Sequence, residues 1–310
     1  MTISSRMCPF AVLICALLWG SAFPGIKAIY AEWEQLGVEA HMPNRLLLAG
    51  VRFTIAGAFL LLLARQPIKE LRRTPWVPLA LFAATQTYIQ YVLFYTALSV
   101  SSAVLGGLLV ASGSFWWLVL APLILKTPWP SRVQWSLIAV GAAGVFLAVY
   151  KPGAGSGQPV LGAVLFCCST LSGTFGVIIL QKVMKTMGAK AATGFGLFLG
   201  GVMLMCSGAA AWSDFAQLFS TKVIWLTLYL AFVSATGFGL WNYLTSLFPV
   251  NLLAGYRFLV PVCAVVESSL FVTGESPGLG IWIGGLLVIF AVIFLQRQQG
   301  KMDRLVHRKI

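Results

Sequence analysis

Three ionisable side chains lie inside apolar runs that are long enough to cross a lipid bilayer. Arg52 and Glu267 lie at comparable depth in their runs, and Lys27 lies nearer the end of its own. A charge at the centre of a bilayer costs about 2.5–3.5 kcal/mol on insertion scales, so each residue is expected to face protein or a wet cavity. We expect Glu267 to pair with Arg52 or Lys27, or else to serve in substrate or proton handling.

Polar and aromatic side chains spaced along a single run form a second group of candidates. Gln86 and Gln90 are four residues apart, and Tyr91 and Tyr95 share another helix face. Buried amides and hydroxyls need hydrogen-bond partners that lipid cannot supply, so this run is expected to face other helices or water. Further candidates for the wall of a solute cavity are Trp19, Phe23, Trp116, Trp241, Asn242 and Arg257.

Aromatic rings in such a cavity would favour aromatic or cationic organic solutes. Stacking and cation–π contacts supply about 0.5–2 kcal/mol each. The alternative is that the rings serve only packing between helices, and that Arg257, near a helix end, contacts a loop or a lipid headgroup.

The elements that must position these residues are membrane helices. The chain has 310 residues, of which 59% are hydrophobic and 9% charged, and its mean hydropathy is +0.90. About a quarter of the residues are charged in a soluble domain, so the composition predicts an all-α membrane protein. Apolar windows between charged or Pro/Gly breaks predict ten transmembrane helices. Their expected limits are 8–30, 44–64, 76–98, 102–125, 131–150, 159–182, 190–212, 222–246, 251–273 and 277–296.

The basic residues predict the orientation of these helices. Fifteen Lys and Arg fall on the side of both termini, and only Arg45, Lys151 and Lys222 fall on the other. Loops rich in Lys and Arg stay in the cytoplasm, so both termini are expected there. The expected location of the protein is the plasma membrane of a bacterium. The net charge of +13 thus reports topology. Because the sequence contains no recognisable nucleic-acid-binding motif, we expect no nucleic-acid partner.

An internal repeat divides the chain into two halves. Residues 95–113 align without gaps on residues 243–261, and residues 17–26 align loosely on 169–178. Each half, 1–152 and 153–310, holds five predicted helices, and an odd number inverts the second copy relative to the first. Two five-helix inverted-topology repeats are typical of secondary transporters, whose substrate site lies near the midplane between the repeats.

Several segments resemble the EamA-type proteins of the drug/metabolite transporter superfamily. They are LLWGSAFPGIKAI at 17–29, the Arg52–Phe53 pair, LFYTAL at 93–98, and Pro261-Val-x-Ala264 leading to Gly274–Glu275. The resemblance covers nearly the whole chain. It implies a ten-helix exporter or exchanger of small metabolites, often amino acids and related compounds, with the fifth helix of each half outside the cavity. The chain departs from the pattern at Gly113, opposite Pro261, and at Leu125–Lys126, where Gly-Glu usually stands.

These features together predict a secondary transporter, an exporter or exchanger, of amino acids or related aromatic or cationic solutes. Alternating access at a midplane cavity is the expected mechanism, with protons as a candidate coupling ion, in a monomer surrounded by lipid. The alternative is a membrane-embedded enzyme or a channel. We expect no enzyme, because the only histidines, His41 and His307, lie in a loop and the tail and no catalytic motif appears. No filter loop is evident, and cysteines without C-x-x-C spacing predict neither a metal nor a cofactor.

Overall fold

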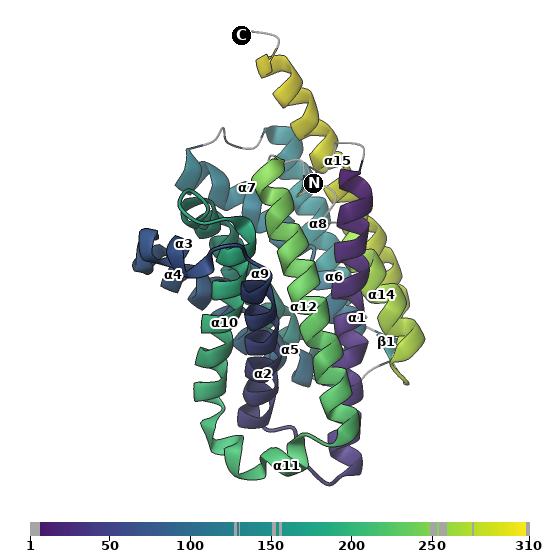
Figure 1. Ribbon diagram of the computed structural model, residues 1–310. Helices are drawn as coiled ribbons and strands as arrows, with labels where there is room; N and C mark the ends of the chain where they lie inside the picture. The colour runs from purple at the N-terminus through teal and green to yellow at the C-terminus, as the bar shows by residue number, and fades with distance from the viewer. Residues whose placement is uncertain are drawn as a thin grey trace.

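The structure is a computed structural model that describes residues 7–126, 129, 131–150, 153–154, 157–248, 253, 259–274 and 276–307. It is a bundle of helices, most of which run along one common direction (Figure 1). Among the described residues, seven helical stretches are long and apolar enough to cross a membrane: Cys8–Gln35, Met42–Leu62, Trp76–Val100, Ala103–Ile124, Pro159–Val183, Ala189–Ser207 and Thr221–Leu247. Shorter apolar segments lie where the fifth, ninth and tenth helices are expected: Trp135–Gly144, Leu259–Phe271 and Leu279–Ala291. The chain is therefore a multi-pass helical membrane protein.

The first half of the chain has one helix more than expected, α3, and interruptions in two of the expected helices. Its elements are α1 (Cys8–Gln35), α2 (Met42–Leu62), α3 (Pro67–Arg73), α4 (Trp76–Ala83), the π-helix η1 (Ala84–Ile89), α5 (Gln90–Val100), α6 (Ala103–Leu109), α7 (Ser112–Leu125) and α8 (Arg132–Tyr150). The third expected helix thus contains a π-helical turn at its centre. The fourth is divided into two helices at Val110 and Ala111.

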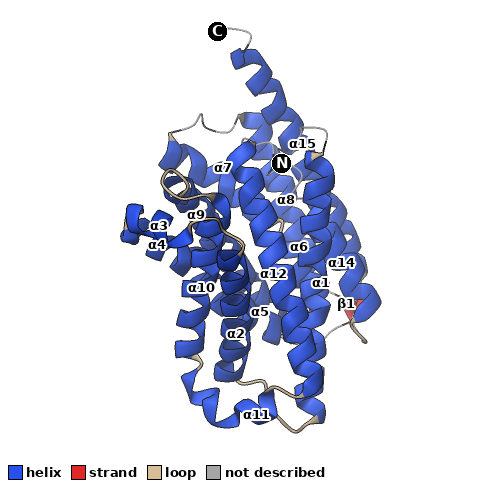
Figure 2. Ribbon diagram, in the orientation of Figure 1, coloured by secondary structure: helices blue, strands red, loops and turns tan. Residues whose placement is uncertain are grey.

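The second half adds a short strand pair to an otherwise helical fold. Its elements are β1 (Gly153–Ala154), α9 (Pro159–Val183), α10 (Ala189–Ser207), the 3₁₀-helix η2 (Ala209–Asp214), α11 (Phe215–Leu218), α12 (Thr221–Leu247), α14 (Leu259–Phe271), β2 (Ser276–Pro277) and α15 (Leu279–His307). The two strands pair antiparallel, with Gly153 opposite Pro277. The expectation of an all-α fold does not include this strand pair, whose β1 is the red element in Figure 2. The expected end at residue 212 is wrong, because α10 ends at Ser207.

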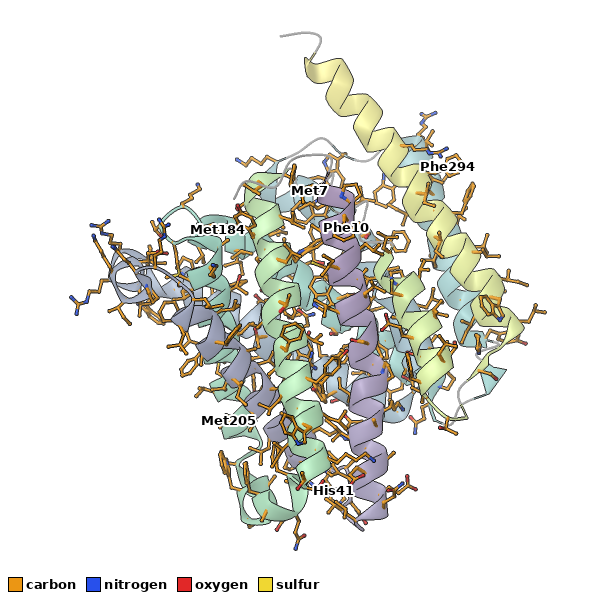
Figure 3. All side chains as sticks on the ribbon, turned by 45° about the vertical axis from the view of Figure 1, so that its right-hand side comes forward. Met7, Phe10, His41, Met184, Met205 and Phe294 are labelled. Atoms are coloured by element: carbon orange, nitrogen blue, oxygen red, sulfur yellow. The ribbon has the colours of Figure 1, made fainter. Side chains whose placement is uncertain are left out.

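Both terminal helices reach the same end of the bundle. α1 begins and α15 ends there, which we call the terminal end, and α11 crosses the opposite end, which we call the α11 end (Figure 1). Met7, just before α1, and His41, just before α2, accordingly lie at opposite ends (Figure 3).

Small residues bring the helices of the two halves into backbone contact. A Cβ atom added at Gly57 of α2 would lie 2.4 Å from the amide nitrogen of Phe198 on α10. A Cβ atom at Gly201 of α10 would lie 2.5 Å from the amide nitrogen of Thr54 on α2. Close approach of this kind is how membrane helices gain packing energy without a hydrophobic driving force. The contact of α2 with α10 is therefore a tight seam between the halves.

Several other helix contacts also join the halves. α1 packs on α12 and α14, α9 packs on α5, α6 and α7, and α8 packs on α15. The main apolar core lies between these helices and includes the buried side chains of Phe23, Phe53, Phe166 and Phe238. Large apolar side chains also cover the outside of the bundle; Leu62, for example, is 84% exposed, as a lipid-facing surface requires.

Candidate functional site

A small cavity lies at the centre of the bundle, between the two halves of the chain. Its volume is about 70 Å³. Small-molecule sites occupy about 300–1,000 Å³, so the cavity is too small in this conformation for an organic solute. It is lined by Trp19, Ala22, Phe23, Arg52, Gln90, Tyr91, Phe94, Val110, Phe166, Ser169, Thr170, Phe238 and Val260.

Arg52 supplies the charge in the cavity wall, and its side chain is 1% exposed. Its Nε donates hydrogen bonds to the Leu230 carbonyl oxygen at 3.1 Å and to Ser234 Oγ at 2.8 Å, both on α12. Its Nη1 donates to Tyr95 Oη at 3.2 Å. The guanidinium carbon also lies 4.8 Å from the centre of the Phe53 ring. In the described part of the chain no carboxylate pairs with Arg52, so neutral dipoles and rings alone surround its charge.

Two uncharged groups of the same wall have unused hydrogen-bonding capacity. Trp19 Nε1 and Gln90 Oε1 are buried and have no partner among the described residues. Each lies against a glycine: a Cβ atom at Gly237 would be 2.7 Å from Trp19 Nε1, and one at Gly173 would be 2.5 Å from Gln90 Oε1. A buried polar group without a partner costs about 1–3 kcal/mol, so these groups need an explanation beyond packing.

Hydroxyl groups of α9 support the π-helical turn that precedes the cavity. Ser172 Oγ donates to the Thr85 carbonyl oxygen at 2.7 Å, and Ser169 Oγ donates to the Gln90 carbonyl oxygen at 2.8 Å. π-helical turns interrupt the regular ladder and occur often at functional sites. Here the turn leads directly into the segment that carries Gln90, Tyr91 and Phe94 into the cavity wall.

Phe94 is the centre of an aromatic cluster on the side of the cavity toward the α11 end. Its ring centre lies 5.3 Å from that of Phe23, 5.5 Å from those of Tyr91 and Phe166, and 5.9 Å from that of Tyr95. Tilted and edge-to-face pairs at such distances contribute about 0.5–1.5 kcal/mol each beyond their buried area. The cluster contains side chains from both halves, so it holds them together at this level.

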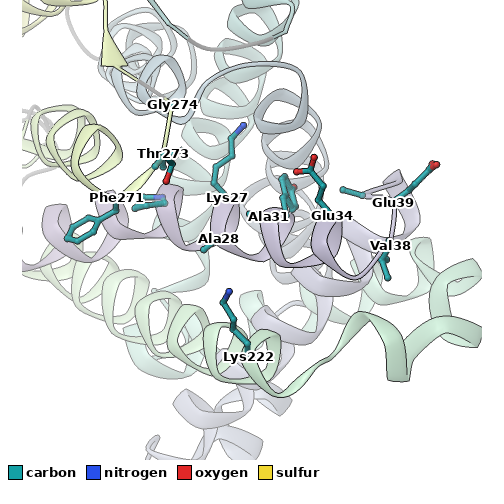
Figure 4. A pocket seen from close by; sticks show the side chains of 15 residues that line it. Lys27, Ala28, Ala31, Glu34, Val38, Glu39, Lys222, Phe271, Thr273 and Gly274 are labelled. Carbon is teal, nitrogen blue, oxygen red and sulfur yellow. The ribbon is translucent and has the colours of Figure 1, made fainter.

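A larger pocket of about 840 Å³ lies at the α11 end. Figure 4 shows the side chains that line it. It is lined by the ends of α1, α12 and α14 and includes the charged residues Lys27, Glu34 and Lys222. Lys27 Nζ donates to the Ser101 carbonyl oxygen at 3.1 Å. Lys222 Nζ lies 2.6 Å from Glu32 Oε2 in a partly exposed ion pair. This outer pocket is separate from the central cavity. On α1, Phe23 lines the central cavity and its neighbour Pro24 lines the outer pocket.

The predicted site residues fall into distinct groups. Trp19, Phe23, Arg52, Gln90 and Tyr91 line the central cavity together. Tyr95 lies behind the cavity wall, as a partner of Arg52. Lys27 lines the outer pocket instead.

Four further predicted residues, Gln86, Trp116, Trp241 and Asn242, lie outside the cavity lining. Asn242 Nδ2 donates to Gln86 Oε1 at 3.4 Å and to Thr193 Oγ1 at 3.0 Å. The ring of Trp241 lies 5.6 Å from that of Trp19. Trp116 Nε1 donates to the Cys167 carbonyl oxygen at 2.9 Å.

The expected ion pair of Glu267 with Arg52 or Lys27 is not formed in this structure. Glu267 Oε2 is buried and has no hydrogen-bond partner among the described residues. The reason is that Arg52 is held by α12 and Tyr95, whereas Lys27 is directed to the end of α5. Arg257 lies outside the described residues.

Several residues of the cavity wall were not predicted from the sequence. Phe94 follows Gln90 by four residues and Tyr91 by three, and this helical spacing was the available signal for it. Four other wall residues come from α9 and α12, and their place depends on how these helices pack: Phe166, Ser169, Thr170 and Phe238. The same holds for Ser234 of α12, which lies outside the lining and accepts a hydrogen bond from Arg52.

Comparison with known proteins identifies the family. The model of the EamA-like transporter family matches residues 6–150 and again residues 160–297. The "Uncharacterized transporter YvbV" of Bacillus subtilis (strain 168) is 26% identical over 298 residues, which cover 93% of this chain and 90% of that protein. A solved structure described only as "Crystal structure of protein" has a TM-score of 0.64 at 16% identity, covers 96% of this chain and 99% of its own, and so shares the fold. Because the family model matches both halves, the chain belongs to the EamA-like transporter family.

Proposed function

We propose that this protein is a secondary transporter, an exporter or exchanger, of amino acids or related aromatic solutes. Its family makes it a membrane solute transporter. The observation that carries the finer proposal is the central cavity, in which the buried Arg52 lies among aromatic rings and has no carboxylate partner in the described part of the chain. Free cationic solutes are not retained as candidates, because a second positive charge beside a buried guanidinium is repelled.

Alternating access is the proposed mechanism. A cavity of about 70 Å³ cannot hold an amino acid, so the solute must enter and leave in conformations that are wider on one side. We take residues 1–152 and 153–310 as the two moving halves, related by inverted topology. Matched contacts support this relation, because α1 packs on α12 as α9 packs on α5, and α1 packs on α14 as α9 packs on α6 and α7. The pairs α2 with α10 and α8 with α15 would then lie on the twofold axis.

The proposed location is the plasma membrane of a bacterium, with the terminal end of the bundle in the cytoplasm. The basic loops support this orientation, among them α3, which carries Lys69, Arg72 and Arg73. We propose that one copy of the chain is sufficient for transport, because the cavity wall is built from a single chain.

Counterflow in proteoliposomes tests this function. Vesicles that hold the purified protein and a high internal concentration of unlabelled L-phenylalanine or L-leucine should accumulate the labelled solute from outside, and vesicles without protein should not. A channel would give flux without this stimulation from the opposite side. An enzyme would return a chemically altered solute. The absence of saturable uptake across a panel of amino acids and aromatic solutes would refute the proposed substrate class.

A further inference from the structure

The central cavity carries a positive charge that no group in the described part of the chain neutralises. Arg52 is 1% exposed, and the ion pairs found in the described chain do not include it. Its hydrogen-bond acceptors are a backbone carbonyl and two hydroxyls, all neutral. Among the described residues, Nη2 of the same guanidinium donates to nothing. A buried guanidinium in this state keeps its attraction for an anion that enters the cavity, above all for a carboxylate.

Two neutral groups of the wall complement that charge. The indole nitrogen Nε1 of Trp19 and the amide oxygen Oε1 of Gln90 are buried without partners in the described chain, and both residues line the cavity with Arg52. An indole N–H can only donate, and it suits a carboxylate oxygen. An amide oxygen accepts, and it suits an ammonium group. The wall therefore offers one cation, one donor and one acceptor.

We infer, on the basis of the proposed transport function, that the cavity, once it is widened during transport, binds its solute as an α-amino acid zwitterion held by its carboxylate. The carboxylate binds Arg52 and the indole of Trp19, and the ammonium group binds Gln90 Oε1. The apolar side chain of the solute lies against the rings of Phe23 and Phe94, which line the same cavity toward the α11 end. Recognition of the carboxylate decides which solutes are bound, and amines without a carboxylate are rejected.

A set of four ligands tests this recognition on the wild-type protein. L-phenylalanine has both charges, 3-phenylpropanoate lacks the ammonium, 2-phenylethylamine lacks the carboxylate, and L-phenylalaninamide replaces the carboxylate with a neutral amide. Their inhibition constants are measured as competition with labelled L-phenylalanine in the counterflow assay. We expect 3-phenylpropanoate to compete, and both amines to bind about 10- to 100-fold more weakly than L-phenylalanine, the loss expected for one charge-assisted hydrogen bond.

Variants assign the two charges to their residues. Arg52→Gln should lose the discrimination between L-phenylalanine and L-phenylalaninamide. Because Arg52 also joins α2 to α12, this variant can fail to fold, and Gln90→Leu is the second test. It keeps Arg52 and should bring the affinities of L-phenylalanine and 3-phenylpropanoate within about twofold of each other. Ser246→Ala serves as the matched control, because its hydroxyl bonds only within its own helix, at an exposed position.

Failure of the inference and failure of the proposed function give different results. If 2-phenylethylamine or L-phenylalaninamide competes as well as L-phenylalanine, recognition through the carboxylate is wrong while transport stands. If Gln90→Leu leaves the ratio of L-phenylalanine to 3-phenylpropanoate unchanged, the ammonium site is wrong. If no amino acid or aromatic solute of the panel shows saturable uptake, the proposed substrate class is wrong, and this site with it.

Discussion

The hydroxyl group of Ser172 on α9 donates a hydrogen bond to the Thr85 carbonyl oxygen in η1, at 2.7 Å. The bond joins the second half of the chain to the π-helical turn in the first half. Because a π-helical turn interrupts the regular backbone ladder, a donor from a neighbouring helix stabilises it at this position. The side chains that follow this turn line the central cavity, so the bond connects the packing of α9 to the geometry of the site.

Loss of this hydroxyl should destabilise the protein. We expect Ser172→Ala to lower the free energy of unfolding by about 1–3 kcal/mol, because the carbonyl group is left without its donor away from water. Thermal unfolding in detergent measures the effect against Ser246→Ala, which removes an exposed hydroxyl bonded within α12. Equal melting temperatures for the two variants would show that the π-helical turn does not depend on Ser172.

The seam between α2 and α10 should tolerate no added methyl group. In Gly57→Ala the new Cβ atom would lie 2.4 Å from the Phe198 amide nitrogen and 2.7 Å from the Gly194 carbonyl oxygen, both backbone atoms. The helices must separate, and we expect loss of folded protein in size-exclusion chromatography. Gly285→Ala on α15 is the control, because its nearest neighbour is 3.7 Å away, and the better helix propensity of Ala should keep or raise the melting temperature. Normal yield and stability of Gly57→Ala would contradict the close contact.

Phe94 should act as a barrier between the central cavity and the α11 end. Its ring packs on Phe23 and Phe166, from opposite halves of the chain. We expect Phe94→Ala to raise the efflux of preloaded solute, and this efflux should no longer require solute on the opposite side of the membrane. Phe290→Ala is the control, because this ring lies on α15, pairs with Phe294 and is 46% exposed. Unchanged dependence on opposite-side solute in Phe94→Ala would exclude the barrier.

Glu267 should mediate any coupling to protons. Its Oε2 is buried and has no hydrogen-bond partner among the residues that the structure describes. Its helix, α14, contributes Val260 to the central cavity and Phe271 to the outer pocket. We expect Glu267→Gln to abolish the response of uptake to an imposed pH gradient and to preserve exchange at equal pH. Glu34→Gln, an exposed carboxylate at the outer pocket, should keep the response. Full pH-dependent uptake by Glu267→Gln would eliminate Glu267 as the coupling group.

The proposed orientation predicts which residues a membrane-impermeant maleimide can reach in intact cells. With the native cysteines replaced, Asp214→Cys in η2 should react from outside. Arg72→Cys in α3 should react only after the membrane is opened. The physical reason is the retention of basic loops in the cytoplasm. Labelling of both positions from the same side would refute the inverted arrangement of the two halves.

The sequence alone predicted the elements whose signals are local. Runs of apolar residues predicted helices at 8–30, 159–182 and 222–246, and the structure has α1, α9 and α12 there with boundaries that differ by at most five residues. A helix that must satisfy its own backbone in lipid is marked by its own length and composition, so its position can be read from the sequence without knowledge of its neighbours.

The partners of the buried charges were decided only by the tertiary structure. Sequence reasoning paired Glu267 with Arg52 or Lys27 by sign and depth, whereas Arg52 is held by Ser234, Tyr95 and a backbone carbonyl. The sign of a charge identifies what could neutralise it, but the rotation and contacts of α2, α12 and α5 decide which groups lie within hydrogen-bond distance. Which groups lie within that distance depends on the close approach of helices at glycines such as Gly57 and on the π-helical turn. Both are set by packing between the two halves of the chain.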